Sequence, residues 1–310
     1  MCRGIQIASL ALFCCLILFF VAAAIYHFTL LKREKPRLTR VGTAVEVDGY
    51  HMNVYLEGKK TDTEATIVLL SGSGVAAPIY DYKILYSKLT DELQVAVVEK
   101  FGYGYSDVSE LPRDVATLVE EDRKALKKAG VEAPYVLMPH SMSALEVVYW
   151  ANTYPEEVEK IIGLDMAVPD CYTKSNMAKI AFMRIMTCFG MHRIPAFCYV
   201  NQDGLSDGEY EQNKLLAHRN SLNADVYEEC RVVLDNAKIV EGLAVPDVPM
   251  LMFTTNLAQA SGHEGWEKAQ GDFAERAQNC LQIKLDCGHN LHYHKSDYIS
   301  EEIKKFMKNL

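Results

Sequence analysis

The sequence predicts an α/β fold in which a mostly parallel sheet carries helices on both faces. Short, purely apolar runs alternate with longer segments in which apolar residues recur at helical spacing. Runs of this kind are typical of parallel strands, because both faces of such a sheet are buried. They occur at residues 66–70, 95–98, 135–138, 161–164, 248–254 and 282–285.

The other elements fit around these strands. Residues 42–57 alternate between polar and apolar side chains around Asp48-Gly49, which predicts a β-hairpin. Residues 170–242 break the alternation, because they read as several consecutive helices rich in methionine and phenylalanine. We expect further helices at residues 80–93, 114–129 and 296–307.

Charge and cysteine usage exclude some classes of function. The chain has 310 residues and a net charge of -9, and a nucleic-acid-binding protein would need a basic face instead. The cysteines show no spacing typical of metal ligands, so we expect no metal site. They are interpreted as ordinary thiols, although a pair in the middle region could form a disulfide outside the cytoplasm.

The amino terminus resembles a membrane anchor. Residues 5–31 are almost entirely apolar, and a bilayer span needs about 20 such residues. The small residues at 22–24 could form a signal-peptide cleavage site, but the apolar run continues beyond them. We therefore expect residues 1–31 to be an uncleaved single-pass anchor, with a signal sequence as the alternative, and residues 32–41 to be a linker.

The orientation of this anchor stays open. Arg3 precedes the apolar run, and five basic residues follow it between positions 32 and 40. That excess after the span favours a cytoplasmic body by the positive-inside rule. Enzymes behind an amino-terminal anchor are commonly exported, however, and long domains cross membranes largely regardless of charge. We expect the body to lie outside the cytoplasm.

The stretch from the strand at 135–138 to the helix at 144–151 contains the leading candidate for a nucleophile. So short a connection forces its middle residue, Ser141, into a cramped backbone conformation at the tip of the turn. A hydroxyl there is exposed beside backbone N–H groups, as attack on a carbonyl requires. Alternatively, Ser141 only caps the helix.

This segment resembles the nucleophile elbow of the α/β-hydrolases, Gly-x-Ser-x-Gly, with Pro139 and Ser143 in place of the two glycines. Residues 99–107 are similar to the family's glycine-rich turn after the fourth strand. The resemblance covers residues 42–310. It implies an α/β-hydrolase fold whose helical cap, at about 170–242, is inserted after the sixth strand.

The resemblance also implies a set of catalytic residues. Gly288-His289 follows the last strand and matches the family's histidine loop, so His289 is expected to be the base for Ser141. His292 and His294 are nearby alternatives. Asp165, at the end of the sixth strand, is expected to be the acid, because no carboxylate follows the seventh strand directly. The alternatives for the acid are Glu264 and Asn256.

The turn after the strand at 66–70 supplies the expected oxyanion hole. It reads Ser71-Gly72-Ser73-Gly74, similar to the family's His-Gly turn with serine in place of the histidine. The resemblance implies that Ser73, with Gly74 beside it, and Met142 after the nucleophile bind the oxyanion or the substrate. A flexible turn is the simpler interpretation.

Together these features predict a serine hydrolase that cleaves small-molecule ester or acyl substrates through an acyl-enzyme, without metal or cofactor. A serine nucleophile argues against family members that use aspartate, such as haloalkane dehalogenases and epoxide hydrolases. An aminopeptidase or amidase is one alternative, in which acidic cap residues would hold a substrate amine. A non-catalytic receptor for a small ligand is another. The cap residues in question are Glu209, Glu211, Glu228 and Glu229.

Overall fold

The computed structural model describes residues 2–60, 65–197, 200–256 and 265–308. These residues form one eight-stranded sheet in the order β1-β2-β4-β3-β5-β6-β7-β8. Strand β2 runs antiparallel to both of its neighbours, β1 and β4, and all other neighbouring strands are parallel. The mostly parallel sheet predicted from the apolar runs is confirmed. The strands are β1 (Thr43–Val47), β2 (Tyr50–Glu57), β3 (Thr66–Leu70), β4 (Val95–Glu99), β5 (Tyr135–Pro139), β6 (Val158–Leu164), β7 (Met250–Thr255) and β8 (Cys280–Leu285).

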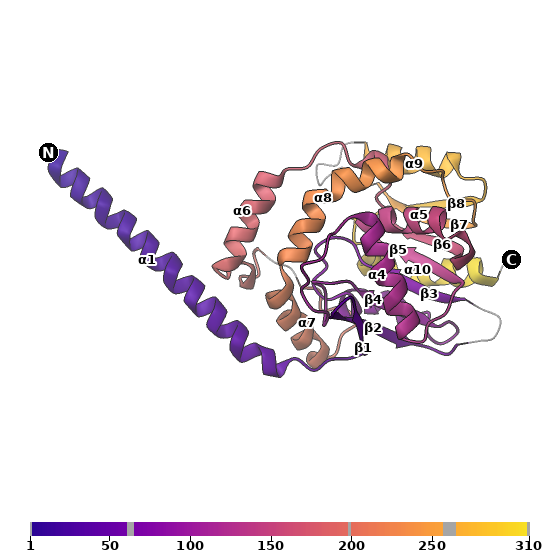
Figure 1. The fold of residues 1–310 in the computed structure, drawn as a ribbon, viewed down its shortest axis with the longest axis horizontal. Helices are drawn as coiled ribbons and strands as arrows, with labels where there is room; N and C mark the ends of the chain where they lie inside the picture. Colours follow the sequence, from indigo (N-terminus) through magenta and orange to yellow (C-terminus); the bar gives the residue numbers. More distant parts are fainter. Residues whose placement is uncertain (1, 61–64, 198–199, 257–264, 309–310) are drawn as a thin grey trace.

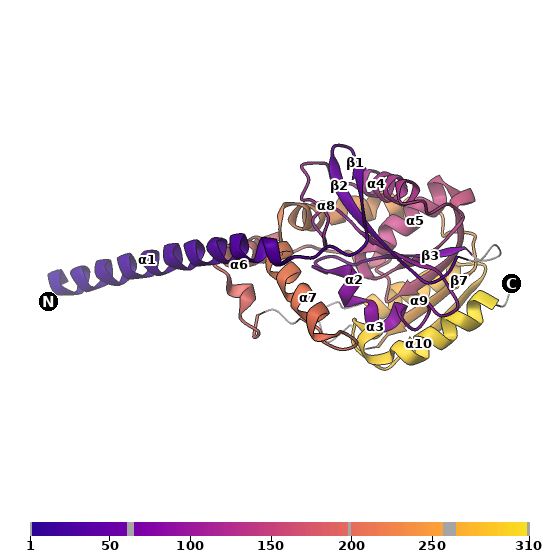
Figure 2. The same ribbon diagram turned by 90° about the horizontal axis from the view of Figure 1, so that it is seen from below.

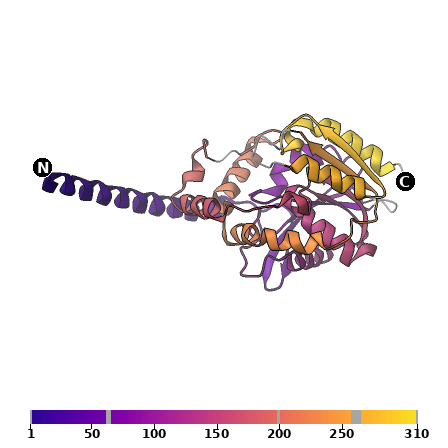
Figure 3. The same cartoon turned by 90° about the horizontal axis from the view of Figure 1, so that it is seen from above.

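Helices cover both faces of the sheet (Figures 1 and 3). Helices α4, α5 and α9 pack in one hydrophobic cluster, and α2, α3 and α10 pack in the cluster on the other face. The helices are α1 (Cys2–Glu34), α2 (Pro78–Asp81), α3 (Lys83–Tyr86), α4 (Val115–Lys128), α5 (Ala144–Thr153), α6 (Met177–Cys188), α7 (Asp207–Asn220), α8 (Ala224–Glu241), α9 (Trp266–Arg276) and α10 (Leu291–Lys308).

Two predicted helices differ in the structure. The single helix expected at 80–93 is wrong, because the chain forms the short helices α2 and α3 followed by turns. Tyr82 separates the two, and its fully buried side chain contacts the active-site loops, so tertiary packing overrides the helical spacing. The last helix begins at Leu291, with a kink at Lys295 directly before its predicted start.

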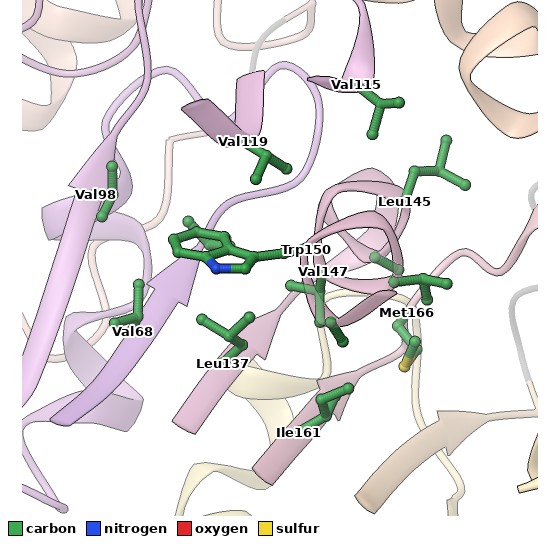
Figure 4. Packing of buried hydrophobic residues seen from close by; sticks show 14 of the residues in the cluster. Val68, Val98, Val115, Val119, Leu137, Leu145, Val147, Trp150, Ile161 and Met166 are labelled. Atoms are coloured by element: carbon green, nitrogen blue, oxygen red, sulfur yellow. The ribbon is translucent and has the colours of Figure 1, made fainter. Parts of the chain in front are cut away.

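The centre of the core fixes the strand that leads into Ser141. Trp150 of α5 is fully buried and packs over Val68 and Leu137, side chains of the neighbouring strands β3 and β5 (Figure 4). The Tyr135 ring meets the Trp150 ring edge-on, with centroids 5.8 Å apart. Because both ends of the β5–α5 connection are anchored in this core, the turn between them has little freedom.

Between β6 and β7 the chain forms α6, α7 and α8, which are the helices of the predicted cap. A buried charge cluster connects the cap to the sheet domain. The Lys100 ammonium lies 2.7 Å from the Glu146 carboxylate of α5 and 3.5 Å from that of Glu229 on α8, and all three side chains are fully buried. This cluster therefore links α8 of the cap to the residue after β4 and to α5.

Helix α1 projects from the body as a long arm (Figures 1 and 2). It is long and apolar enough to cross a membrane, and none of its most apolar window is buried. A signal sequence near an amino terminus has the same features. Cleavage of the segment, and the side of the membrane on which the body lies, stay predictions.

Candidate active site

Ser141 lies in the turn between β5 and α5 with a φ of 55°, in the left-handed region that residues with a Cβ rarely adopt. The strained conformation predicted for this position is therefore present. The turn is held from the β6 side, because the Ala167 N–H donates a 2.8 Å hydrogen bond to the Ser141 carbonyl.

The two departures from the elbow signature are accommodated locally. The fully buried Ser143 hydroxyl donates a 2.7 Å hydrogen bond to the Leu70 carbonyl at the end of β3. Pro139 pairs with Leu70 in register, and the N–H of the next residue, His140, makes the 3.0 Å bond to the Leu70 carbonyl. A serine and a proline thus fit where glycines are usual.

His289 and Asp165 form a close pair. His289 lies in the loop between β8 and α10, and its Nδ1 is 2.6 Å from the Asp165 carboxylate. Asp165 follows β6, is fully buried and has a φ of 43°. The structure therefore brings together the two residues that the sequence singled out, although they are far apart in the chain.

Two residues that the sequence analysis missed complete the surroundings of Asp165. The N–H and hydroxyl of Thr255 donate to its two oxygens at 3.1 and 3.2 Å, and the Gln270 side-chain amide donates at 3.0 Å. These donors fix the orientation of the carboxylate. Thr255 ends β7, so the strand next to β6 in the sheet supplies two of these donors.

The alternative residues lie elsewhere. Asn256 is exposed, and its N–H bonds to the Leu285 carbonyl at 3.4 Å. His292 is buried in α10 with its Nε2 3.2 Å from Asp81, and His294 is exposed. Glu264 falls outside the residues that the structure describes. Of the described alternatives, none makes the contact that Asp165 makes with His289.

Ser141 and His289 line the same cavity, which has a volume of about 330 Å³. The Trp266 ring stands edge-on to the His289 imidazole, with centroids 5.4 Å apart. Apart from His289, no side chain that can carry a charge at neutral pH lines the described part of the cavity. The lining residues are Ser73, Ser141, Met142, Tyr172, Ser175, Ile180, Cys230, Val233, Trp266 and His289.

The predicted oxyanion turn lies directly against Ser141. A Cβ added to Gly72 would stand 2.8 Å from the Ser141 Cβ, so only glycine permits this approach. The Gly74 N–H donates to the Tyr103 hydroxyl at 3.3 Å and is thereby occupied. Ser73 and Met142 both line the cavity, so the N–H groups of these two remain the candidates for the oxyanion hole.

We expect Gly72→Ala to lower turnover on the order of 100-fold, because the new methyl group must displace Ser141 or the turn, and displacements of about 1 Å have effects of that size. Gly208→Ala is the matched control, since a Cβ there meets nothing within 4 Å. Steady-state rates of both variants, with thermal melts to show that they are folded, check this. Equal activity of the two variants would contradict the close approach.

His140 is a second residue that the sequence analysis missed. Its fully buried ring lies 4.7 Å from the His289 ring between centroids, with Nε2 3.2 Å from the His289 carbonyl and Nδ1 2.9 Å from the Tyr82 hydroxyl. Burial lowers the pKa of His140 well below its usual value. The neutral ring can then donate from Nε2 to the His289 carbonyl, which holds the histidine loop. The sequence could have indicated this role of His140 only through its position directly before Ser141.

The fold is similar to that of known structures. The chain matches epoxide hydrolase A from Mycobacterium thermoresistibile with a TM-score of 0.65 and 19% identity, covering 88% of this chain and 99% of that one. It matches the enol-lactonase from Burkholderia xenovorans LB400 with a TM-score of 0.61 and 15% identity, covering 86% of this chain and 100% of that one. These matches show that the chain has the α/β-hydrolase fold.

The chain also belongs to the same family as a bacterial relative of similar length. The uncharacterized protein YbdG of Bacillus subtilis (strain 168) is 34% identical over 322 aligned residues, covering 99% of this chain and 98% of the relative. The similarity thus extends through the apolar amino terminus as well as the sheet and cap. No protein-family model matches the chain.

Proposed function

We propose that this protein is a serine hydrolase that cleaves carboxylic esters through an acyl-enzyme intermediate. The observation that carries the proposal is the cavity itself. It is lined by a strained, hydroxyl-bearing residue, Ser141, and by an imidazole, His289, whose other side is 2.6 Å from the buried Asp165. A nucleophile, a base and a group that orients the base are the parts that acyl transfer requires.

In the proposed mechanism, the Ser141 hydroxyl attacks the ester carbonyl while His289 Nε2 takes its proton. The backbone N–H groups of Ser73 and Met142 stabilise the oxyanion that forms. Collapse of this intermediate breaks the ester C–O bond, and the proton on His289 passes to the departing alcohol. His289 then takes a proton from a water molecule, which attacks the carbonyl of the acyl-enzyme. The bond to the Ser141 oxygen breaks, the proton passes from His289 to that oxygen, and the carboxylic acid is released.

Asp165 keeps His289 in the tautomer that this sequence needs. Because its carboxylate accepts from Nδ1, the Nε2 atom is left without a proton and can act as a base. The carboxylate also stabilises the imidazolium formed during attack. Since Asp165 is fully buried and bonded to Thr255 and Gln270, its position changes little during the cycle.

The cavity favours ester substrates over substrates with a free amine. The four acidic cap residues considered for amine binding are absent from its described lining. Their carboxylates are engaged elsewhere: with Lys83 (Glu209), with Arg37 and Lys214 (Glu211), with Arg231 (Glu228), and with Tyr103 and Lys100 (Glu229). The enol-lactonase of the same fold acts, by its name, on a cyclic ester, and a serine nucleophile suits that chemistry better than epoxide opening.

A panel of p-nitrophenyl esters of increasing acyl length, with the matched anilides, tests the proposal. We expect hydrolysis of esters and much slower hydrolysis of anilides, because an amide carbonyl is less electrophilic than an ester carbonyl and an anilide is a poorer leaving group than p-nitrophenolate. Anilide turnover as fast as ester turnover would favour an amidase instead. Saturable binding of these compounds without turnover would favour a receptor.

A further inference from the structure

We propose that the cap helix α6 lies in the interface of a membrane, and that the cavity takes its substrate, an acyl-chain ester, from the bilayer. The position of α6 follows from how the cap is attached to α1. The substrate class rests, in addition, on the proposed function.

The segment after α6 is tied to the end of α1. The Arg193 guanidinium donates two hydrogen bonds to the Glu34 carboxylate, at 2.7 and 2.8 Å, and a third to His27 Nδ1 at 2.9 Å. Glu34 and Arg193 are each only 13% exposed, and such a bidentate pair fixes orientation as well as distance. These hydrogen bonds therefore fix the position of the cap along the axis of α1.

Helix α1 cannot enter a bilayer without bringing the cap to its surface. Residues 5–19, the part exposed on all sides, are only about 22 Å long, whereas a hydrocarbon core is roughly 30 Å thick. Residues 5–26, which end just before the polar contact at His27, give about 33 Å and match that thickness. The polar contacts of Arg193 then lie at the headgroup level.

A second contact places α6 below this level. The ring of Phe20 packs against that of Phe189, the residue after α6, with centroids 4.8 Å apart. Phe20 lies seven residues before His27, so this contact falls about 10 Å inside the boundary. Helices that lie in a membrane interface bury their apolar faces about 5–10 Å deep, which agrees with this position.

The composition of α6 suits that environment. None of its residues is fully buried by the protein, and Phe182, Met183 and Ile185 are 60, 46 and 53% exposed. Its charged residues, Lys179 and Arg184, are both basic, although the whole chain is acidic. Exposed apolar side chains with basic neighbours are the pattern of helices that bind anionic lipid surfaces.

The same helix forms one wall of the cavity. Ile180 of α6 lines it together with Tyr172 and Ser175 of the preceding segment, and Ser141 lines the same cavity. The helix that we place against the lipid thus contributes to the wall of the cavity that contains the proposed nucleophile. An amphiphilic ester can slide along α6 so that its carbonyl reaches Ser141 while its acyl chain stays in apolar surroundings.

Fluorescence quenching tests the position of α6. The full chain is reconstituted in vesicles of phosphatidylcholine and phosphatidylglycerol whose acyl chains are brominated. We expect strong quenching of the added tryptophan in Phe182→Trp and little in the control Tyr298→Trp, which is exposed on α10 away from α1 (Figure 2). The quenching measured with wild-type protein gives the contribution of the two native tryptophans, Trp150 and Trp266, which is subtracted. Equal quenching of the two variants would overturn the proposal and leave the face to a protein partner.

Hydrolysis tests the route of the substrate. In Phe182→Asp/Ile185→Asp, both side chains are exposed, so the fold is expected to remain intact, as melts will check. We expect turnover of a vesicle-borne long-chain ester to fall at least about tenfold, and turnover of a soluble short ester to stay within about twofold. Equal loss on both substrates would overturn the route. If wild type cleaves no ester at all, the proposed function fails, while quenching still decides the position of α6.

Discussion

Replacement of Ser141 by alanine is expected to lower kcat for a short p-nitrophenyl ester by about 10⁶-fold, the loss seen when a triad nucleophile is removed. The variant keeps the residual acceleration that the oxyanion hole and substrate binding supply. Its fold should be unchanged, because alanine keeps the Cβ of this strained position, with its φ of 55°, and loses only the hydroxyl. Initial rates and thermal melts measure the two effects.

Ser175→Ala is the matched control for this variant. Ser175 is a half-buried serine that lines the same cavity, so its replacement removes a hydroxyl without touching the proposed nucleophile. We expect its kcat to change by less than about tenfold. If Ser141→Ala retains wild-type turnover, the assignment of the nucleophile is wrong.

Replacement of Asp165 by asparagine is expected to lower kcat by about 10⁴-fold. The asparagine amide can turn an N–H toward His289 Nδ1, which would leave the proton on Nε2 and remove the base. The remaining partners, Thr255 and Gln270, donate to whichever atom takes the carboxylate's place, so one of these bonds is lost as well. Rates from pH 5 to 10, with melts alongside, separate the catalytic effect from a loss of stability.

Asp286→Asn provides the comparison for this second variant. Asp286 is an exposed carboxylate in the same loop as His289, so the change alters the charge nearby without touching the pair. Its kcat should stay within about threefold of wild type. A near-normal rate for Asp165→Asn would contradict the role assigned to Asp165, because His289 would then act without this carboxylate.

Much of the fold was predictable because burial leaves a clear pattern in the sequence. Each parallel strand is a short apolar run between helical segments, so the sheet and the place of the cap follow from periodicity. The single helix predicted at residues 80–93 was wrong because the Tyr82 side chain is buried and forms a hydrogen bond with His140. That contact joins two segments that are far apart in the chain, so the spacing of apolar residues around Tyr82 does not predict it.

The candidate site was predictable in part for a similar reason. Ser141, Asp165 and His289 each lie within four residues of the end of a strand, so their places at the carboxyl edge of the sheet follow from topology. Thr255 and Gln270, by contrast, reach Asp165 across 90 and 105 residues of chain. Their side chains are ordinary residues for a strand end and a helix, and only the packing of α9 beside β7 gives them a role.

The most direct test of the proposed chemistry is covalent labelling of the folded full chain with a fluorophosphonate, followed by peptide mapping. Such a probe reacts with a serine only when a base and an oxyanion hole activate it. We predict one adduct, on Ser141, that is lost in Ser141→Ala and strongly slowed in Asp165→Asn. A folded protein that stays unlabelled at Ser141, or carries the adduct on another serine, would contradict the account.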